Sequence, residues 1–417
     1  MGLHGLDKYK TSRLNKKVNL NISGGGDVAQ YYLSVSHANE NGLLKVDPLS
    51  NFNNNIEIKR SNLRANINVN LSKTTEIAVK YYSLFERYNG PIDNATRIFE
   101  MVADANPANF PKTFTPDQNT MNLSHTLFGN KGNGGYPNPY ADMVKGYKDR
   151  FKNTTLAQFE LKQDLSFITE GLNIRGMGSV RTYSMNQNDR SFTPFFYGIG
   201  QLETDLGTSN YLYQIQEGTE FLNDPNIVNE SNSNFYYQLV TEYNRTFNEK
   251  HEVGGLLVAN ASEALNTIGG GTAFTTLPSR NMGVSGRASY NYDSRFFAEF
   301  NFGYNGSEKF AKENRFGFFP SAGFGWIISN EDFFETNLPS VNLFKLRYTY
   351  GLVGNDGISG PEDRFFYLSE VNLNNGGTGY NWGINYNNYY NGYNINRYDN
   401  ESVTWEVAEK ANYGLEI

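Results

Sequence analysis

Residues 282–334 read MGVSGRASYNYDSRFFAEFNFGYNGSEKFAKENRFGFFPSAGFGWIISNEDFF, and this stretch decides the fold class. Near its start, the apolar residues Met282, Val284 and Tyr290 stand at even-numbered positions, while the polar residues Ser285 and Arg287 stand at odd-numbered positions. Because successive side chains of a strand point to opposite faces, this period of two predicts a strand with one apolar and one polar face.

A second strand follows a tight turn at Asp293 and Ser294. The alternation resumes there, with Phe296, Phe300 and Tyr304 on one side. Each arm of the resulting hairpin has about ten residues, whereas strands of soluble proteins usually have about 5–6. A tilted strand that crosses a membrane needs about 9–11 residues. The stretch therefore predicts a membrane-crossing β-hairpin.

The same alternation recurs along the chain and predicts an all-β fold, an antiparallel transmembrane β-barrel with about thirteen strands. Short turns alternate with long loops, as expected for short periplasmic turns and long extracellular loops. The longest loops are expected near residues 40–55, 87–150, 186–233 and 352–400, with one short helix at 95–105. An odd number of strands leaves an antiparallel barrel unclosed, so we expect further strands outside this chain.

The polar faces and the loops hold the candidate contact residues. Arginines at polar strand positions are expected to face a wet lumen: Arg64, Arg175, Arg181, Arg287 and Arg347. Aromatic residues at strand ends are expected to form girdles at the membrane interfaces: Tyr31, Tyr81, Tyr292, Phe296, Tyr304, Trp326, Tyr348 and Tyr350. Aromatic residues of the last long loop either stack on a substrate or pack against a neighbouring loop or a partner protein: Tyr380, Trp382, Tyr386, Tyr389, Tyr390 and Tyr393.

Composition argues against several other functions. The chain has no cysteine, which removes thiol catalysis and thiolate metal sites. Its net charge is −7 without a basic cluster, so nucleic acid is a poor partner. The four histidines (His4, His37, His125 and His251) lack metal-ligand spacing, and the glycine groups at 24–26 and 269–271 lack the setting of a phosphate loop. We therefore expect no catalytic, cofactor or metal site, and no enzyme activity.

A set of residues after the central hairpin carries a family resemblance: Phe319, Pro320, Ser321, Trp326, Asn330, Glu331, Asp332 and Phe333. A Phe-Pro-Ser segment, a Trp and an Asn-Glu-Asp-Phe end in this order resemble the SusC/RagA family of TonB-linked outer-membrane transporters. The loop at 305–310 resembles the family's Asp-Gly-Ser-Ser-Arg-Phe loop but departs from it at the first, fourth and fifth positions, so no role is carried over to those side chains.

Shorter segments extend the resemblance along the chain. Residues 31–34 (YYLS), 346–351 (LRYTYG), 404–406 (TWE) and 412–416 (NYGLE) are similar to family strand motifs. The resemblance implies a 22-stranded barrel behind an N-terminal plug. Residues 1–417 are then expected to be part of that barrel domain, with the plug, the signal peptide and the C-terminal strands absent.

The resemblance also implies a function and partners. It implies energised import of nutrient oligomers, glycans or peptides, across a Gram-negative outer membrane. It implies a SusD-like surface lipoprotein as a lid, and energy from TonB–ExbB–ExbD through the missing N-terminal part. Two other hypotheses remain at this stage: a secreted or surface-exposed β-rich adhesin or glycan-binding protein, which needs shorter strands, and a passive porin, which shares the barrel but has no plug.

Overall fold

A computed structural model describes residues 14–417 except 46, 205–206, 269–275, 339 and 358–363. His4 and the glycine group at 269–271 therefore lie outside the described residues. The dominant element is one antiparallel sheet of 13 strands, in agreement with the predicted number. Its strands are β1 (Asn15–Gly25), β2 (Ala29–Asn41), β3 (Glu57–Asn70), β4 (Thr75–Gly90), β6 (Gly146–Asp164), β7 (Leu172–Ser191), β10 (Asn226–Phe247), β11 (His251–Ile268), β12 (Ser279–Tyr292), β13 (Phe296–Ser307), β14 (Phe316–Ile327), β15 (Lys345–Asn355) and β18 (Glu406–Glu416).

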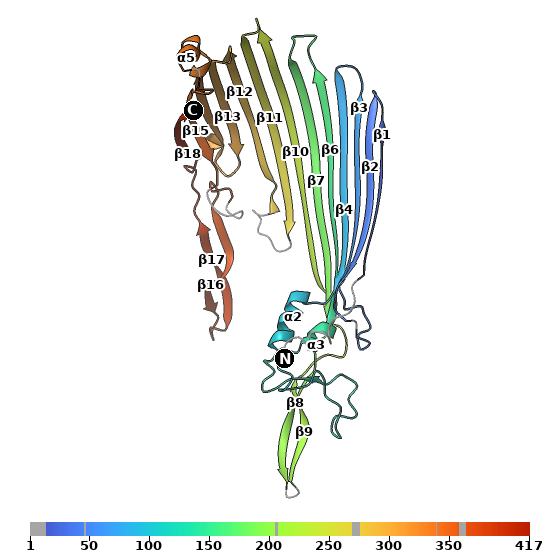
Figure 1. Cartoon of the computed structure of the whole chain (residues 1–417). Helices are drawn as coiled ribbons and strands as arrows, with labels where there is room; N and C mark the ends of the chain where they lie inside the picture. The colour runs from blue at the N-terminus through green and yellow to red at the C-terminus, as the bar shows by residue number, and fades with distance from the viewer. Residues whose placement is uncertain (1–13, 46, 205–206, 269–275, 339, 358–363) are drawn as a thin grey trace.

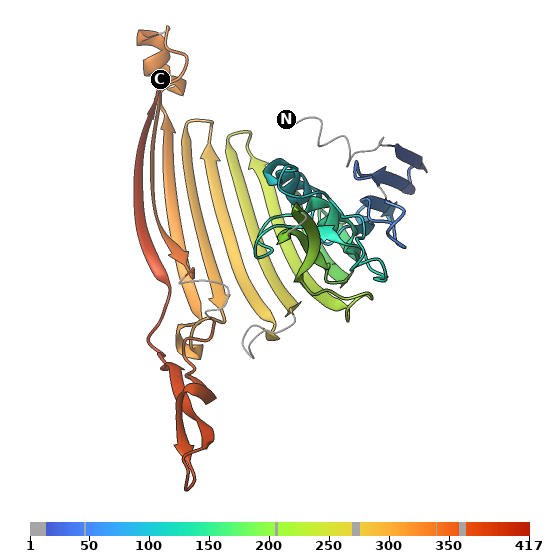
Figure 2. The same cartoon turned by 90° about the horizontal axis from the view of Figure 1, so that it is seen from below.

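The order of the strands in the sheet follows the order of the chain, from β1 at one edge to β18 at the other. Each strand is therefore the antiparallel neighbour of the next one, apart from the loop hairpins that are inserted between them. Figure 2 shows the strands following one another around a curved wall. This is the wall of an antiparallel β-barrel of the kind that the alternation predicted.

Strand length separates this sheet from ordinary soluble sheets. The shortest sheet strands have 11 residues and the longest, β10, has 22, beyond the usual 3–10 residues of globular strands. Two of the tight turns are each made by a pair of residues with positive φ: Asp293 and Ser294 after β12, and Asn248 and Glu249 after β10. Such turns match the right-handed twist of paired strands. The hairpin predicted around Asp293 is confirmed, with Tyr292 opposite Phe296.

Most apolar side chains of the sheet lie on one face, and many of them are exposed. One cross-strand row joins Val79, Phe159, Gly178 and Tyr237 through four neighbouring strands. Phe159 is 49% exposed and Tyr237 58%. A continuous exposed apolar face of this kind marks a surface that meets another apolar phase.

The connections differ between the two ends of the sheet. At the short-turn end, most connections are tight, but residues 328–344 form a longer one that contains η2 (Ile328–Asn330) and α5 (Asp332–Asn337). At the long-loop end, residues 91–145 and 192–225 pack together below β4, β6, β7 and β10, and we call these two segments the loop module (Figure 1).

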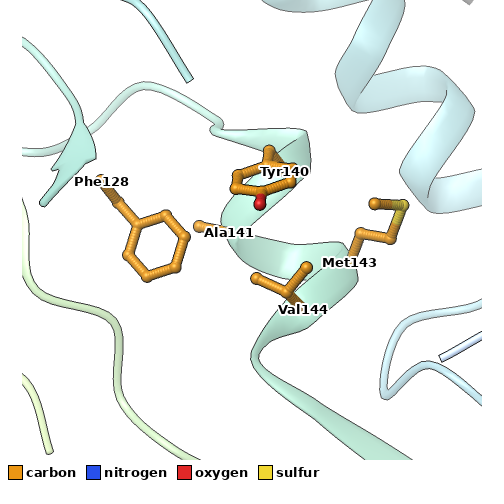
Figure 3. Close-up of a cluster of buried hydrophobic side chains, with 5 residues drawn as sticks. All are labelled: Phe128, Tyr140, Ala141, Met143 and Val144. Atoms are coloured by element: carbon orange, nitrogen blue, oxygen red, sulfur yellow. The ribbon is translucent and has the colours of Figure 1, made fainter. Parts of the chain in front are cut away.

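The loop module has secondary structure and a small core of its own. It contains α2 (Ala95–Asp104), β5 (Phe128–Gly129), α3 (Pro139–Val144), β8 (Phe196–Thr204) and β9 (Gly207–Gln216). The helix expected at 95–105 is confirmed as α2. Figure 3 shows the buried cluster of Phe128, Tyr140, Ala141, Met143 and Val144. Among the described helices, none is both long and apolar enough to cross a membrane.

Two segments expected as loops contain hairpins. β8 pairs with β9 within residues 186–233, and β16 (Glu370–Trp382) pairs with β17 (Asn388–Arg397) within residues 352–400. Both segments were expected to be long loops, and the hairpins within them were not predicted. Their Tyr, Asn and Gly content hides the strand signal, and register shifts along β16 and β17 break the alternation. A short 3-10 turn, η1 (Lys312–Asn314), lies between β13 and β14.

Candidate functional site

The polar face of the sheet brings the five predicted arginines onto one side. Arg64 lies opposite Tyr82, Tyr82 opposite Leu156, and Leu156 opposite Arg181, so the two arginines share one cross-strand row. Arg175 lies on the same face, since it is six positions, an even number, before Arg181 on β7. The register thus places these three on the face opposite the exposed apolar row.

The remaining two arginines lie on the same face farther along the sheet. Arg287 is opposite Asn301, and Arg347 is opposite Gly325. Because Met282 and Tyr290 occupy the other parity on β12, Arg287 points away from the apolar side.

Charges on the polar face are of both signs and are partly paired. Lys80 Nζ is 2.8 Å from Glu160 Oε1, and Arg347 Nε is 3.2 Å from Glu416 Oε1. The Arg64 guanidinium lies 5.6 Å from the centre of the Tyr82 ring. A face of this composition suits contact with water and with polar solutes, because its charged groups have ion-pair partners and also remain in contact with solvent.

A hollow of about 720 Å³ lies on the polar side of β10–β15, toward the short-turn end. Its lining includes Gly254, Gly323 and Gly325, which carry no side chain to fill it, and Glu299 and Arg347. Small residues at these positions leave room on the inner side of the wall, and the flanking charges make the room polar.

The Asn-Glu-Asp-Phe segment holds the end of β14 to the neighbouring turn. Trp326 donates its ring N–H to Glu331 Oε1 at 3.1 Å, and Arg295 Nη1 lies 3.1 Å from Glu331 Oε2. Asn330 donates its side-chain amide to Ser294 O at 2.8 Å. Asp332 begins α5, and Phe333 is exposed. These contacts give the segment a structural role at the short-turn end.

The Phe-Pro-Ser segment lies toward the opposite end of the same strand. Phe319 packs edge-on against Trp405, with ring centres 5.2 Å apart, and it covers Gly317 and Gly354, where any Cβ would collide with its ring. The next two residues continue β14, with Pro320 opposite Phe302 and Ser321 opposite Gly351.

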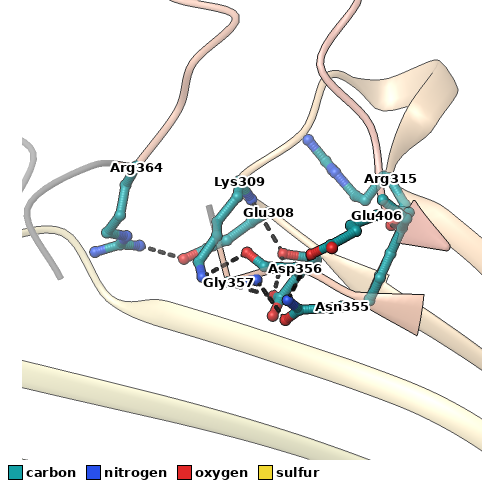
Figure 4. Close-up of polar contacts among 10 residues, drawn as sticks. Glu308, Lys309, Arg315, Asn355, Asp356, Gly357, Arg364 and Glu406 are labelled. Carbon is teal, nitrogen blue, oxygen red and sulfur yellow. Dashed lines mark hydrogen bonds and ion pairs between the residues drawn. The ribbon is translucent and has the colours of Figure 1, made fainter. Parts of the chain in front are cut away.

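A polar cluster that gathers around Glu308, Lys309 and Asp356 was missed by the sequence analysis (Figure 4). Ser307 Oγ donates to Asp356 Oδ2 at 2.8 Å, and Lys309 Nζ donates to Asp356 O at 2.9 Å. Arg364 pairs with Glu308 and donates to the carbonyl of Leu277 at 2.7 Å. Glu308 and Lys309 stand at two of the positions where the loop departs from the family pattern. That departure was the available signal, but their partners lie about fifty residues away in the sequence.

The six loop aromatics lie along the β16–β17 hairpin, which projects beyond the long-loop end of the sheet (Figure 1). Tyr380 is opposite Tyr390, and its ring lies 6.2 Å from that of Trp382. All six side chains are exposed, including those of Tyr386, Tyr389 and Tyr393, which follow along the same hairpin. The structure thus places them on an open surface and does not gather them into one cavity.

Among the described residues, no group of three His, Cys, Asp or Glu side chains is close enough to hold a metal ion. The carboxylate of Glu331 already accepts a hydrogen bond from Trp326 and forms an ion pair with Arg295.

No family model matches the chain. The TonB-dependent receptors P3 and P39 of Formosa agariphila are 22% and 25% identical, over 99% of this chain and 39% and 36% of their own lengths. The TonB-dependent receptor SusC of Bacteroides thetaiotaomicron is 35% identical over 153 residues, which are 35% of this chain and 14% of SusC. The chain thus spans less than two fifths of these relatives.

A solved structure shows the same fold. The RagAB peptide importer in its closed-closed state superposes with a TM-score of 0.60 over 99% of this chain and 43% of that chain, at 13% identity. The wall of long antiparallel strands, the sequence motifs and the TonB-dependent relatives all indicate the same kind of protein. The chain is thus similar in sequence and fold to TonB-dependent transporters of the SusC/RagA type.

Proposed function

We propose that this chain forms part of the barrel wall of an outer-membrane importer of nutrient oligomers, glycans or peptides, that is energised by TonB. The observation that carries the proposal is the two-faced sheet, whose strands of 11 to 22 residues have an exposed apolar face and a charged polar face. The apolar face would meet lipid, and the polar face with its five arginines would line the lumen.

The relatives support the proposed partners. RagAB is a peptide importer, and SusC is a TonB-dependent receptor. We place the contact with a SusD-like lipoprotein, or with the substrate, at the exposed aromatic residues of the β16–β17 hairpin. The plug and the contact with TonB–ExbB–ExbD would belong to segments of a longer protein outside residues 1–417. In this arrangement the long-loop end faces the outside of a Gram-negative cell.

The same observation weighs against a secreted adhesin. A soluble sandwich buries the apolar face of each sheet against another sheet, whereas here residues such as Val18 and Leu239 are 68% and 48% exposed. A passive porin would share the wall, so it is separated from an energised importer by experiment.

The test is uptake of labelled oligopeptides and oligosaccharides by cells that carry or lack the full-length gene. An importer concentrates one class of oligomer, and uptake stops when the proton motive force is dissipated or TonB is deleted. Uptake that persists without TonB would indicate a porin, and surface binding without uptake would indicate an adhesin. Either result would overturn the proposal.

A further inference from the structure

A second cavity lies in the loops, away from the wall. Its volume is about 440 Å³, within the range of roughly 300–1,000 Å³ that small-ligand sites occupy. Its lining comes from three parts of the loops, residues 49–52, residues 124–126 with 128, and residues 192, 195 and 219–222, together with Val144. Its floor includes Phe128 and Val144 of the loop-module core (Figure 3), so one side of the cavity rests on packed side chains.

One carboxylate is fixed at this cavity. Ser124 Oγ donates to Glu220 Oε1 at 2.7 Å, and His125 Nδ1 lies 3.5 Å from the same oxygen. The hydrogen bond from Ser124, and to a smaller extent that from His125, holds the pKa of Glu220 below its ordinary value. The carboxylate is therefore charged at neutral pH. Glu220 keeps 56% of its side chain exposed and is therefore accessible to a ligand.

The rest of the lining is aromatic or neutral. The His125 ring stacks on Phe195 with ring centres 3.7 Å apart and planes 12° apart, and its Nε2 lies 2.8 Å from the phenolic oxygen Oη of Tyr197. Phe221 lines the cavity and is 72% exposed. Ser50 Oγ lines it as a buried oxygen without a hydrogen-bond partner in the described structure. No Lys or Arg is among the lining residues.

We propose that this cavity binds an organic cation with an alkyl stem, the side chain of a lysine or arginine within a peptide. The apolar floor and the Phe rings would cover the methylene groups, and aromatic faces attract cations. Glu220 would accept a charge-assisted hydrogen bond from the ammonium or guanidinium group. An anionic group would be repelled, because its charge would meet Glu220 without a lining Lys or Arg to balance it.

This inference rests on the proposed importer function, since it assigns the cavity to recognition of cargo at the long-loop end. It narrows the cargo from oligomers in general to peptides with a basic residue. A neutral oligosaccharide is the competing ligand, because sugars also stack on aromatic rings and donate to carboxylates.

The test uses the purified full-length transporter in detergent and three capped fluorescent pentapeptides that differ at one position: lysine, norleucine or glutamate. Fluorescence anisotropy gives their affinities. We expect the lysine peptide to bind most tightly and the glutamate peptide least. Glu220→Gln should weaken the lysine peptide about tenfold, to the level of the norleucine peptide, because a hydrogen bond between charged groups is lost.

Two further variants keep the result interpretable. Glu217→Gln makes the same charge change at a nearby exposed residue outside the cavity lining and should leave all three affinities unchanged. Phe221→Ala should weaken the lysine and norleucine peptides alike, because it removes an exposed apolar wall.

Equal binding of the lysine and norleucine peptides, or an unchanged lysine affinity in Glu220→Gln, would overturn the inference. Binding of a neutral oligosaccharide that Glu220→Gln abolishes would also overturn it and reassign the cavity to glycans. TonB-dependent uptake in cells is measured separately. If uptake persists without any peptide preference, only this inference fails, whereas a preference without uptake would leave the cavity assigned and refute the importer.

Discussion

Replacing Asn138 with alanine is expected to loosen the loop module while leaving the barrel wall intact. Asn138 is 5% exposed and makes four hydrogen bonds with its side chain. Its Oδ1 accepts from the backbone N–H groups of Tyr140 and Ala141, both at 3.1 Å, and so caps α3. Its Nδ2 donates to the carbonyls of Lys112 and Gly129 at 3.0 and 2.9 Å.

The magnitude follows from these four bonds. Loss of a helix cap costs about 1 kcal/mol. Each buried carbonyl that loses a donor costs roughly 1–3 kcal/mol, and the lower value applies to Lys112 because Gly129 N also donates to that carbonyl, at 3.2 Å. We therefore expect a loss of about 3 kcal/mol in local stability, which corresponds to roughly 100-fold faster amide exchange.

The assay is hydrogen exchange with mass spectrometry on the full-length transporter in detergent, followed through peptides that cover 126–131 and 139–144. Asn138→Ser retains the cap and loses the two donors, so its effect should be smaller by about 1 kcal/mol. Asn94→Ala is the matched control, because Asn94 caps α2 through one bond to Arg97 N, at 2.8 Å, and should affect α2 alone. Exchange in Asn138→Ala that equals the unmodified protein would refute the reasoning.

Three other predictions concern the wall, an aromatic contact and pH. Leu239→Arg places a charge on the exposed apolar face and should lower the free energy of unfolding by about 2–4 kcal/mol near the bilayer centre. Gln238→Arg, on the other face, should be tolerated. Urea unfolding in lipid vesicles compares the two variants, and equal losses would contradict the two-faced wall. Gly354→Val collides with the Phe319 ring and should cost about 1–3 kcal/mol by overpacking, seen as a smaller fraction of heat-modifiable folded protein; an unchanged fraction would contradict it. Hydrogen bonds, chiefly from the β9 backbone, lower the pKa of Asp117 below 3.8. The stabilisation by its carboxylate is therefore present above pH 3.8 and is lost as the pH falls through the lowered pKa. Pepsin should cut the β8–β9 hairpin more readily below the lowered pKa, and Asp117→Asn should flatten this dependence of cleavage on pH.

Alternation along the chain was enough to predict the wall. It located the turn at Asp293, the number of sheet strands and the faces on which Arg64 and Arg287 lie, because the period of two is a local property of the backbone. The helix at 95–105 was also predictable, since Asn94 supplies a local cap. Each of these signals is contained within a few residues.

Features that depend on distant partners were not predictable from one sequence. The Arg364–Glu308 pair joins residues 56 positions apart, and His125 meets Tyr197 across 72 positions. The β16–β17 hairpin lacks a regular alternation because its register shifts. In each case the missing information was tertiary: which loop lies beside which other loop.

Stability and recognition are carried by different parts of this chain. Of the described buried apolar residues, only Ala78 and Val240 belong to the 13-stranded sheet, while most of the others, such as Phe128 and Phe310, lie in connections. The wall is therefore held chiefly by its backbone hydrogen-bond ladder, and the loops have small packed cores of their own. On the proposed function, substitutions at Glu220 or Phe221 are expected to alter recognition without changing the wall, because both residues lie outside the 13-stranded sheet. On the proposed function, a change of cargo would then require changes in the loops alone.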